Sequence, residues 1–135
     1  MLENEYTGSK FRIVHCKGAI GSFEAALQGI PARQRTKYIN DLIIQINRLA
    51  DGGRMSKSRF PREGKLPKRK GQQKDKYFRA FKKIPIRGYC WYSEVVGNAY
   101  FISHYIHKKK DDLDGRDTTK VANNWRRIEE KGDER

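Results

Sequence analysis

The 135-residue chain has only two cysteines, no long apolar stretch and few acidic residues where it is most basic. Cys16 and Cys90 follow neither metal-binding nor disulfide-framework spacing, and both lie in apolar runs that predict buried, reduced thiols. No apolar run approaches the roughly 20 residues that a membrane-spanning helix needs. Because the N-terminus also lacks the basic start and apolar stretch of a signal peptide, we expect a cytoplasmic protein with no membrane partner.

Positive charge dominates the sequence and is unevenly placed. Lysine and arginine number 30 against 16 aspartates and glutamates, a net charge of +14. Residues 54–83 hold thirteen basic residues and only two acids, Glu63 and Asp75, whereas residues 111–135 are slightly acidic. Such a block repels itself unless an anion binds it, and nucleic-acid phosphates are the obvious anion. The alternative is a solvated, disordered basic loop without a dedicated partner.

Periodicity and turn residues divide the chain into one block of helices and one of strands. Residues 54–76, here called the arm, contain glycine, proline and many cations but few apolar residues, which predicts a long basic loop. In chain order the predicted elements are a strand at 10–16, helices at 23–28 and 31–50, the arm, strands at 77–84, 86–95 and 99–108, and a helix at 118–130.

This order predicts a single α+β domain over residues 1–135, with flexible ends. Consecutive strands with short links favour an antiparallel meander. We therefore expect a small antiparallel sheet, made of the N-terminal strand and the three-strand C-terminal meander. Two N-terminal helices should pack on it, followed by a C-terminal helix, with the helices on one face of the sheet.

Three segments in this order resemble the RelE/HigB-type toxins of toxin–antitoxin systems. Residues 76–83 (KYFRAFKK) resemble the family's aromatic strand with an arginine, and residues 86–92 (IRGYCWY) resemble its next strand. Residues 104–109 (HYIHKK) are similar to the HigB-type ending, a histidine followed by a lysine pair. The resemblance implies an endoribonuclease (an mRNA interferase) that cuts mRNA at the ribosome, contacts ribosomal RNA phosphates and is silenced by a cognate antitoxin protein.

Cleavage of RNA without a metal needs an activated 2′-hydroxyl, a stabilised phosphorane and a protonated leaving group. His104 matches the family's histidine and is the expected proton carrier, unless it is merely hydrogen-bonded within its strand. Arg79 and Arg87 are expected to stabilise the phosphorane, unless each only pairs with a surface acid. Lys109 and Lys65 complete the catalytic set that the resemblance implies, with Lys68 as the alternative to Lys65.

Other basic and aromatic residues are predicted to bind RNA without taking part in the chemistry. Aromatic rings stack on bases, and cations hold phosphates. These residues are Lys68, Arg69, Lys70, Lys82, Lys83, Tyr89, Trp91, His107 and Lys108. His15, by contrast, is predicted to be structural. No P-loop, GxGxxG or HExxH motif is present, so neither a metal nor a cofactor is expected.

Two functions remain open from the sequence. The first is an mRNA interferase, and the second is a non-catalytic RNA- or DNA-binding or ribosome-associated module of the same fold. Convergence of His104, Arg79 and Arg87 on one concave basic surface would favour the first function.

Overall fold

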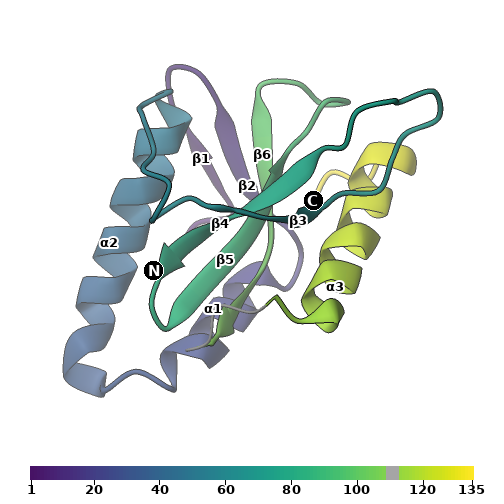
Figure 1. Ribbon diagram of the computed structural model, residues 1–135. Helices are drawn as coiled ribbons and strands as arrows, with labels where there is room; N and C mark the ends of the chain where they lie inside the picture. The colour runs from purple at the N-terminus through teal and green to yellow at the C-terminus, as the bar shows by residue number, and fades with distance from the viewer. Residues whose placement is uncertain (109–112) are drawn as a thin grey trace.

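A computed structural model describes residues 1–108 and 113–135, in which one β-sheet lies between helices (Figure 1). The helices are α1 (Ala19–Leu27), α2 (Ala32–Ala50) and α3 (Gly115–Trp125), and α3 continues into a π-helical turn, η1 (Arg126–Glu130). The strands are β1 (Glu5–Thr7), β2 (Arg12–His15), β3 (Arg62–Lys65), β4 (Tyr77–Lys83), β5 (Ile86–Tyr92) and β6 (Ala99–His107).

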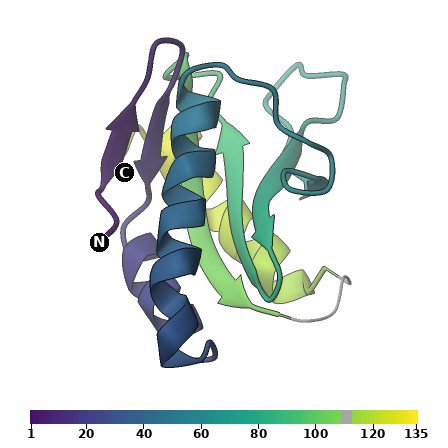
Figure 2. The same ribbon diagram turned by 90° about the vertical axis from the view of Figure 1, so that its left-hand side faces the viewer.

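The sheet has six strands in the described part of the chain, in the order β1-β2-β6-β5-β4-β3 (Figure 2). Every neighbouring pair is antiparallel except β2 and β6, which run parallel. The fold is α+β, but the predicted small antiparallel sheet of four strands is wrong. β1 and β3 were missed because they are very short and polar (EYT and REGK) and carry no alternating apolar pattern. The parallel pair was missed because the order of strands in the chain does not determine their order in the sheet.

Helices cover both faces of the sheet, not one face as predicted (Figure 1). Helices α1 and α2 bury Phe23 and Ile46 on one side, here called the α2 face. Helix α3 buries Val121 and Trp125 on the other side, here called the α3 face. The C-terminal helix has its own amphipathic stripe, and the uncovered apolar side of the sheet is the surface that can bury it.

The first helix begins earlier than its sequence predicted. It starts at Ala19, whereas a helix over residues 23–28 was expected. The Ser22 hydroxyl does not cap the helix, because it donates to the Ala19 carbonyl (2.6 Å) and accepts the Tyr105 N–H (2.9 Å). The serine therefore lies inside α1 and ties it to β6.

The two cysteines lie in opposite cores, Cys16 on the α3 face and Cys90 on the α2 face. Both are buried and free, which confirms the prediction of buried thiols. Burial raises the pKa of the Cys16 thiol to about 12, so the reactive thiolate is suppressed. None of the described helices is long and apolar enough to cross a lipid bilayer.

His15 links the N-terminal segment to the core. Its Nδ1–H donates to the Glu3 carbonyl (2.7 Å), so Nε2 accepts the hydroxyl proton of Tyr105 (2.7 Å). The ring is fully buried, and burial lowers the pKa of His15 to about 4. The neutral imidazole therefore has a structural role, as the sequence analysis predicted.

Because the folded protein holds His15 neutral, acid should destabilise it. Above pH 6.5 the imidazole is neutral in both states, and between pH 6.5 and about 4 only the unfolded chain binds the proton. The free energy of unfolding should fall there by about 1.4 kcal/mol per pH unit, roughly 3 kcal/mol in all. Urea denaturation across this range measures the slope. The variant His15→Asn, which cannot titrate, should lack this part of it, and equal slopes for both proteins would contradict the assignment.

Candidate nucleic-acid interface

The arm, residues 54–76, forms the outer edge of the sheet next to β4 (Figure 2). It was predicted as a loop, but part of it is β3, and the Ala80 N–H also donates to the Pro61 carbonyl (3.1 Å). Beyond β3, Leu66 is buried in the core of the α3 face, and its N–H donates to the Lys76 carbonyl (2.8 Å). The basic side chains of the arm are therefore presented from an edge that is joined to the sheet.

Two carboxylates pair with the cations of the arm. One carboxylate oxygen of Asp75 lies 3.2 Å from Lys65 Nζ, and the other lies 3.4 Å from Lys68 Nζ. The hydrogen bond from Lys65 lowers the pKa of Asp75. Lys70 is exposed nearby. Ion pairs this exposed contribute little to folding stability, so the lysines can exchange Asp75 for another anion at small cost. The catalytic role predicted for Lys65 and the phosphate-binding role predicted for Lys68 stay predictions.

Glu94, in the connection between β5 and β6, pairs with a second couple of cations. Its Oε1 lies 3.4 Å from Lys76 Nζ, and its Oε2 lies 3.7 Å from Arg69 Nη1. The three side chains are between 39% and 51% exposed. Glu94 was not identified from the sequence as a partner of the arm, because Glu94 and Arg69 are far apart along the chain.

Arg79 lies on the α2 face, where it is half-buried. Its Nη1 donates to the Phe60 carbonyl (3.3 Å), and its guanidinium carbon lies 5.7 Å from the centre of the Phe60 ring. In the sheet it is opposite Cys90, which belongs to the core beneath α1 and α2. The guanidinium thus holds the start of the edge segment against the sheet.

Arg87 lies on the opposite face, beneath α3. It shares this face with Tyr89 and Trp91, and all three side chains are at most 1% exposed. The Trp91 ring stacks on Phe101 (5.6 Å between centroids), and the Tyr89 ring meets Phe78 edge-on. The rings predicted to stack on bases therefore fill the core between sheet and helix, where no base can reach them in this arrangement.

His104 lies in β6 beneath α3, and both of its ring nitrogens are hydrogen-bonded. Nε2 lies 3.0 Å from the Asp117 carboxylate of α3, and Nδ1 lies 2.7 Å from the Ser103 hydroxyl. A carboxylate can only accept, so Nε2 carries the proton and Nδ1 accepts from Ser103. Asn124 in turn donates to the Ser103 oxygen (2.8 Å). With 2% of its surface exposed, His104 is part of a buried polar network that joins β6 to α3.

A β-bulge gives His104 this orientation. Tyr89 lies opposite His104 but Cys90 lies opposite Ile102, so Ser103 is an extra residue in β6. Ile102 therefore stays in the core of the α2 face, while His104 turns to the α3 face. Burial lowers the pKa of His104, against the effect of its hydrogen bond to Asp117, so the ring is neutral near pH 7. Ser103 was missed as a site residue because no sequence signal marks the bulge, and Asp117 was missed because it meets His104 only through the packing of α3 on the sheet.

An open hollow of about 300 Å³ lies at the end of β6. The exposed His107 and the half-buried Lys108 line it, together with Arg116 and Asp117 of α3. The preceding Asp114 caps α3 and binds the Arg116 guanidinium (2.9 Å), whose hydrogen bond lowers the pKa of Asp114 to about 2. Lys109, predicted to be catalytic, lies outside the described residues.

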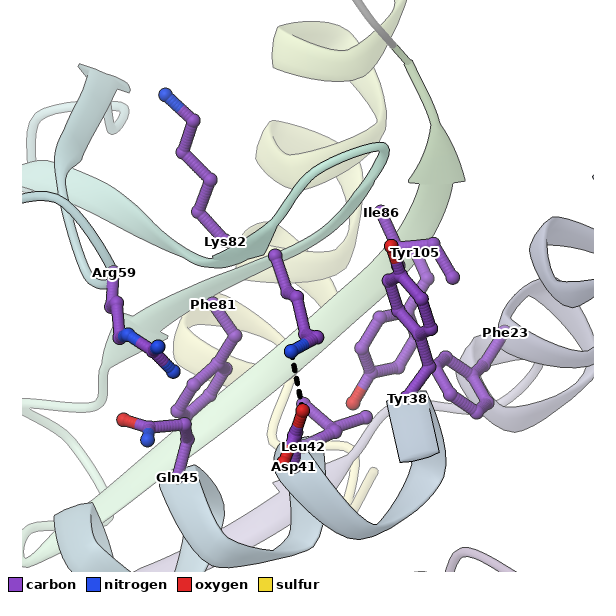
Figure 3. A pocket seen from close by; sticks show the side chains of 11 residues that line it. Phe23, Tyr38, Asp41, Leu42, Gln45, Arg59, Phe81, Lys82, Ile86 and Tyr105 are labelled. Atoms are coloured by element: carbon purple, nitrogen blue, oxygen red, sulfur yellow. Dashed lines mark hydrogen bonds and ion pairs between the residues drawn. The ribbon is translucent and has the colours of Figure 1, made fainter. Parts of the chain in front are cut away.

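Lys82 and Lys83 lie on opposite faces of β4. Lys83 forms an ion pair with Asp41 of α2, drawn as the dashed line in Figure 3, and its Nζ lies 5.3 Å from the centre of the Tyr38 ring. Both residues border a small cavity of about 30 Å³, too small for a nucleotide. Lys82 points away from this cavity in Figure 3. Of the two lysines, only Lys82 therefore extends away from α2.

The three residues expected to form one catalytic surface do not converge. His104 and Arg87 are buried on the α3 face, whereas Arg79 lies on the α2 face. Among the described residues, no three His, Cys, Asp or Glu side chains are close enough to bind a metal ion. Comparison of the chain with family models, with curated proteins and with solved structures finds no match. The resemblance to RelE/HigB toxins thus rests on its three sequence segments and stays a prediction.

If the His104 network ties α3 to the sheet, His104→Ala should lower the free energy of unfolding by about 1–3 kcal/mol. The substitution removes the acceptor of the buried Ser103 hydroxyl proton and takes the Nε2 donor away from Asp117. Urea denaturation followed by tryptophan fluorescence measures the change. His107→Ala is the matched control, and because that ring is exposed, it should change the free energy by about 0.5 kcal/mol or less. Equal stabilities of the two variants would contradict a structural role for His104.

Proposed function

We propose that the protein binds single-stranded RNA, and that the arm and the adjoining end of β4 hold its phosphate backbone. The observation that carries this proposal is the attachment of the arm to the sheet through β3 and the buried Leu66. A basic segment that is fixed in place presents its charges together, whereas a disordered loop would lose entropy on binding. The net charge of +14, concentrated in residues 54–83, supplies the attraction.

Aromatic residues beside these cations favour single-stranded over double-stranded nucleic acid. The Arg62 guanidinium lies over the ring of Tyr77, at the start of β4, with its carbon 4.4 Å from the ring centre. Tyr92, at the end of β5, is 39% exposed. Unstacked bases can lie on such rings, whereas a duplex would offer mainly phosphates and groove edges. An anionic membrane is disfavoured because the cations do not lie on an amphipathic helix.

Neutralising the arm should weaken RNA binding and its salt dependence. A quadruple variant with glutamine at Lys65, Lys68, Arg69 and Lys70 should flatten the slope of log affinity against log salt by about 0.7 for each phosphate that the protein no longer neutralises. Fluorescence anisotropy with a labelled single-stranded RNA at several salt concentrations measures both quantities.

The matched control removes the same charge from the opposite side of the molecule or from the C-terminal end. It replaces Lys17, Arg33, Lys37 and Lys131, all of which are exposed, with glutamine. If the control variant loses as much affinity as the arm variant, binding depends on net charge alone and the arm is not the interface.

Cleavage of mRNA, as in RelE/HigB toxins, is a second candidate function, and the hollow at the end of β6 favours it. There Lys108 and Arg116 offer positive charge, and Asp117 connects to His104. His107 borders the hollow, and its ring lies beside Gly29 of the α1–α2 connection. A cation could stabilise the phosphorane while a histidine moves the 2′-hydroxyl proton, without a metal. With this function the partners would be mRNA on the ribosome, in the cytoplasm, and a cognate antitoxin protein.

If the hollow cleaves mRNA, His107→Ala and Lys108→Ala should each lower cleavage about a hundredfold or more, since each removes a group that acts in the transition state. Arg79→Ala should stay near the wild-type rate, because its guanidinium lies on the α2 face and bonds to Phe60. Induction in a bacterial host, with growth curves and mapping of mRNA 5′ ends, measures these effects. Normal growth and intact mRNA with the wild-type protein would exclude cleavage and leave RNA binding as the function.

A further inference from the structure

A second hollow, of about 210 Å³, lies between the arm and the C-terminal end of α3. Figure 1 shows the arm reaching across toward this end of the helix. Tyr77 of β4 and Trp125 of α3 line the hollow, and Arg69 and Lys76 line it from the arm. It is smaller than the roughly 300–1,000 Å³ typical of pockets for drug-sized ligands, so it suits one planar group rather than a large molecule.

The charged side of this hollow is built around Glu94. One carboxylate oxygen pairs with the Arg69 guanidinium (3.7 Å), and the other pairs with the Lys76 ammonium (3.4 Å). A phosphodiester also offers two charged oxygens that a guanidinium and an ammonium can share. Because all three side chains are well exposed, the ion pairs with Glu94 are weak and can be exchanged for pairs with an incoming phosphate.

The position of Glu94 does not depend on these ion pairs. Its backbone N–H donates to the Glu129 carboxylate (3.1 Å), which also accepts the Ser93 hydroxyl (2.7 Å). Glu129 is 9% exposed and belongs to the turn that follows α3. The backbone of the β5–β6 connection is thus fastened to η1, while the Glu94 side chain is free to move away from the cations.

We propose that this hollow binds one nucleotide of single-stranded RNA and that Glu94 occupies the phosphate position in the free protein. The base stacks on the half-buried Tyr77, and its phosphate takes the place of the Glu94 carboxylate on Arg69 and Lys76. Glu94 is then a built-in competitor that lowers the affinity for RNA. The inference rests on the proposed RNA-binding function and names the site where a base is held.

The first test removes the competitor without changing its size. Glu94→Gln should bind a labelled single-stranded RNA about fivefold more tightly or better, because both cations are released. The slope of log affinity against log salt should steepen by about 0.7 for each further phosphate that the protein neutralises. Glu24→Gln is the matched control, since Glu24 is exposed on α1 and its loss changes the net charge by the same amount. Equal effects of the two substitutions would overturn the proposal.

The second test separates the base from the phosphate. Tyr77→Leu should weaken binding to RNA about tenfold, the scale of one lost base stack, but leave binding to inorganic polyphosphate unchanged. Tyr38→Leu, on α2 away from the hollow, should alter neither. An equal loss for RNA and polyphosphate would show that Tyr77 does not hold a base, and would overturn the proposal.

The proposed function and the nucleotide site fail in different ways. If the wild-type protein and Glu94→Gln both bind no RNA at physiological salt, the RNA-binding function is wrong, and the site falls with it. If the wild-type protein binds RNA and the arm variant weakens it, but Glu94→Gln matches Glu24→Gln, only the nucleotide site is wrong.

Discussion

Strand β6 holds the two halves of the molecule together through its hydrogen bonds to parallel β2 on one side and antiparallel β5 on the other. Both of its faces are covered, so its side chains serve one of two cores, except the exposed His107 at its end. On the α2 face, Tyr105 packs edge-on against Phe23 (5.0 Å between ring centroids) and donates to His15. On the α3 face, His104 reaches Asp117. The Ser103 bulge makes this division possible, because in a regular strand Ile102 and His104 would point to the same side.

Burying two histidines in these cores limits the chemistry that they can perform. Each ring has both nitrogens engaged with protein groups, and burial lowers the pKa of each. A neutral imidazole with both nitrogens hydrogen-bonded can connect two structural elements. Its burial does not destabilise the fold, because no polar group is left without a partner. Such an imidazole is poorly placed to exchange a proton with a substrate. Exposed basic groups lie at the end of β6 and along the arm, outside the two cores.

The arm forms an ordered edge of the sheet although its many positive charges repel one another. Strand β3 and the buried Leu66 attach the arm to the sheet and so hold its cations close together. Two carboxylates, Asp75 and Glu94, each form ion pairs with two of these cations. Asp75 and Glu94 lower the repulsion locally but leave a large excess of positive charge. Exposed ion pairs of this kind are weak, so these cations can exchange the two carboxylates for other anions at small cost.

Local patterns in the sequence determined much of this protein. Apolar spacing identified the long helix that became α2 and the three strands that became β4, β5 and β6, and the apolar runs around Cys16 and Cys90 identified buried thiols. Charge counting identified the basic arm. These properties could be predicted because periodicity and charge belong to neighbouring residues in the chain. The tertiary structure decided the rest: the parallel pairing of β2 with β6, the short edge strands, and the faces on which Arg79 and Arg87 lie. It also decided that Asp117 binds His104 and that Glu94 binds Arg69. Those contacts join residues distant in the chain, and they depend on strand register and on a bulge that shifts it by one residue, which no local pattern records.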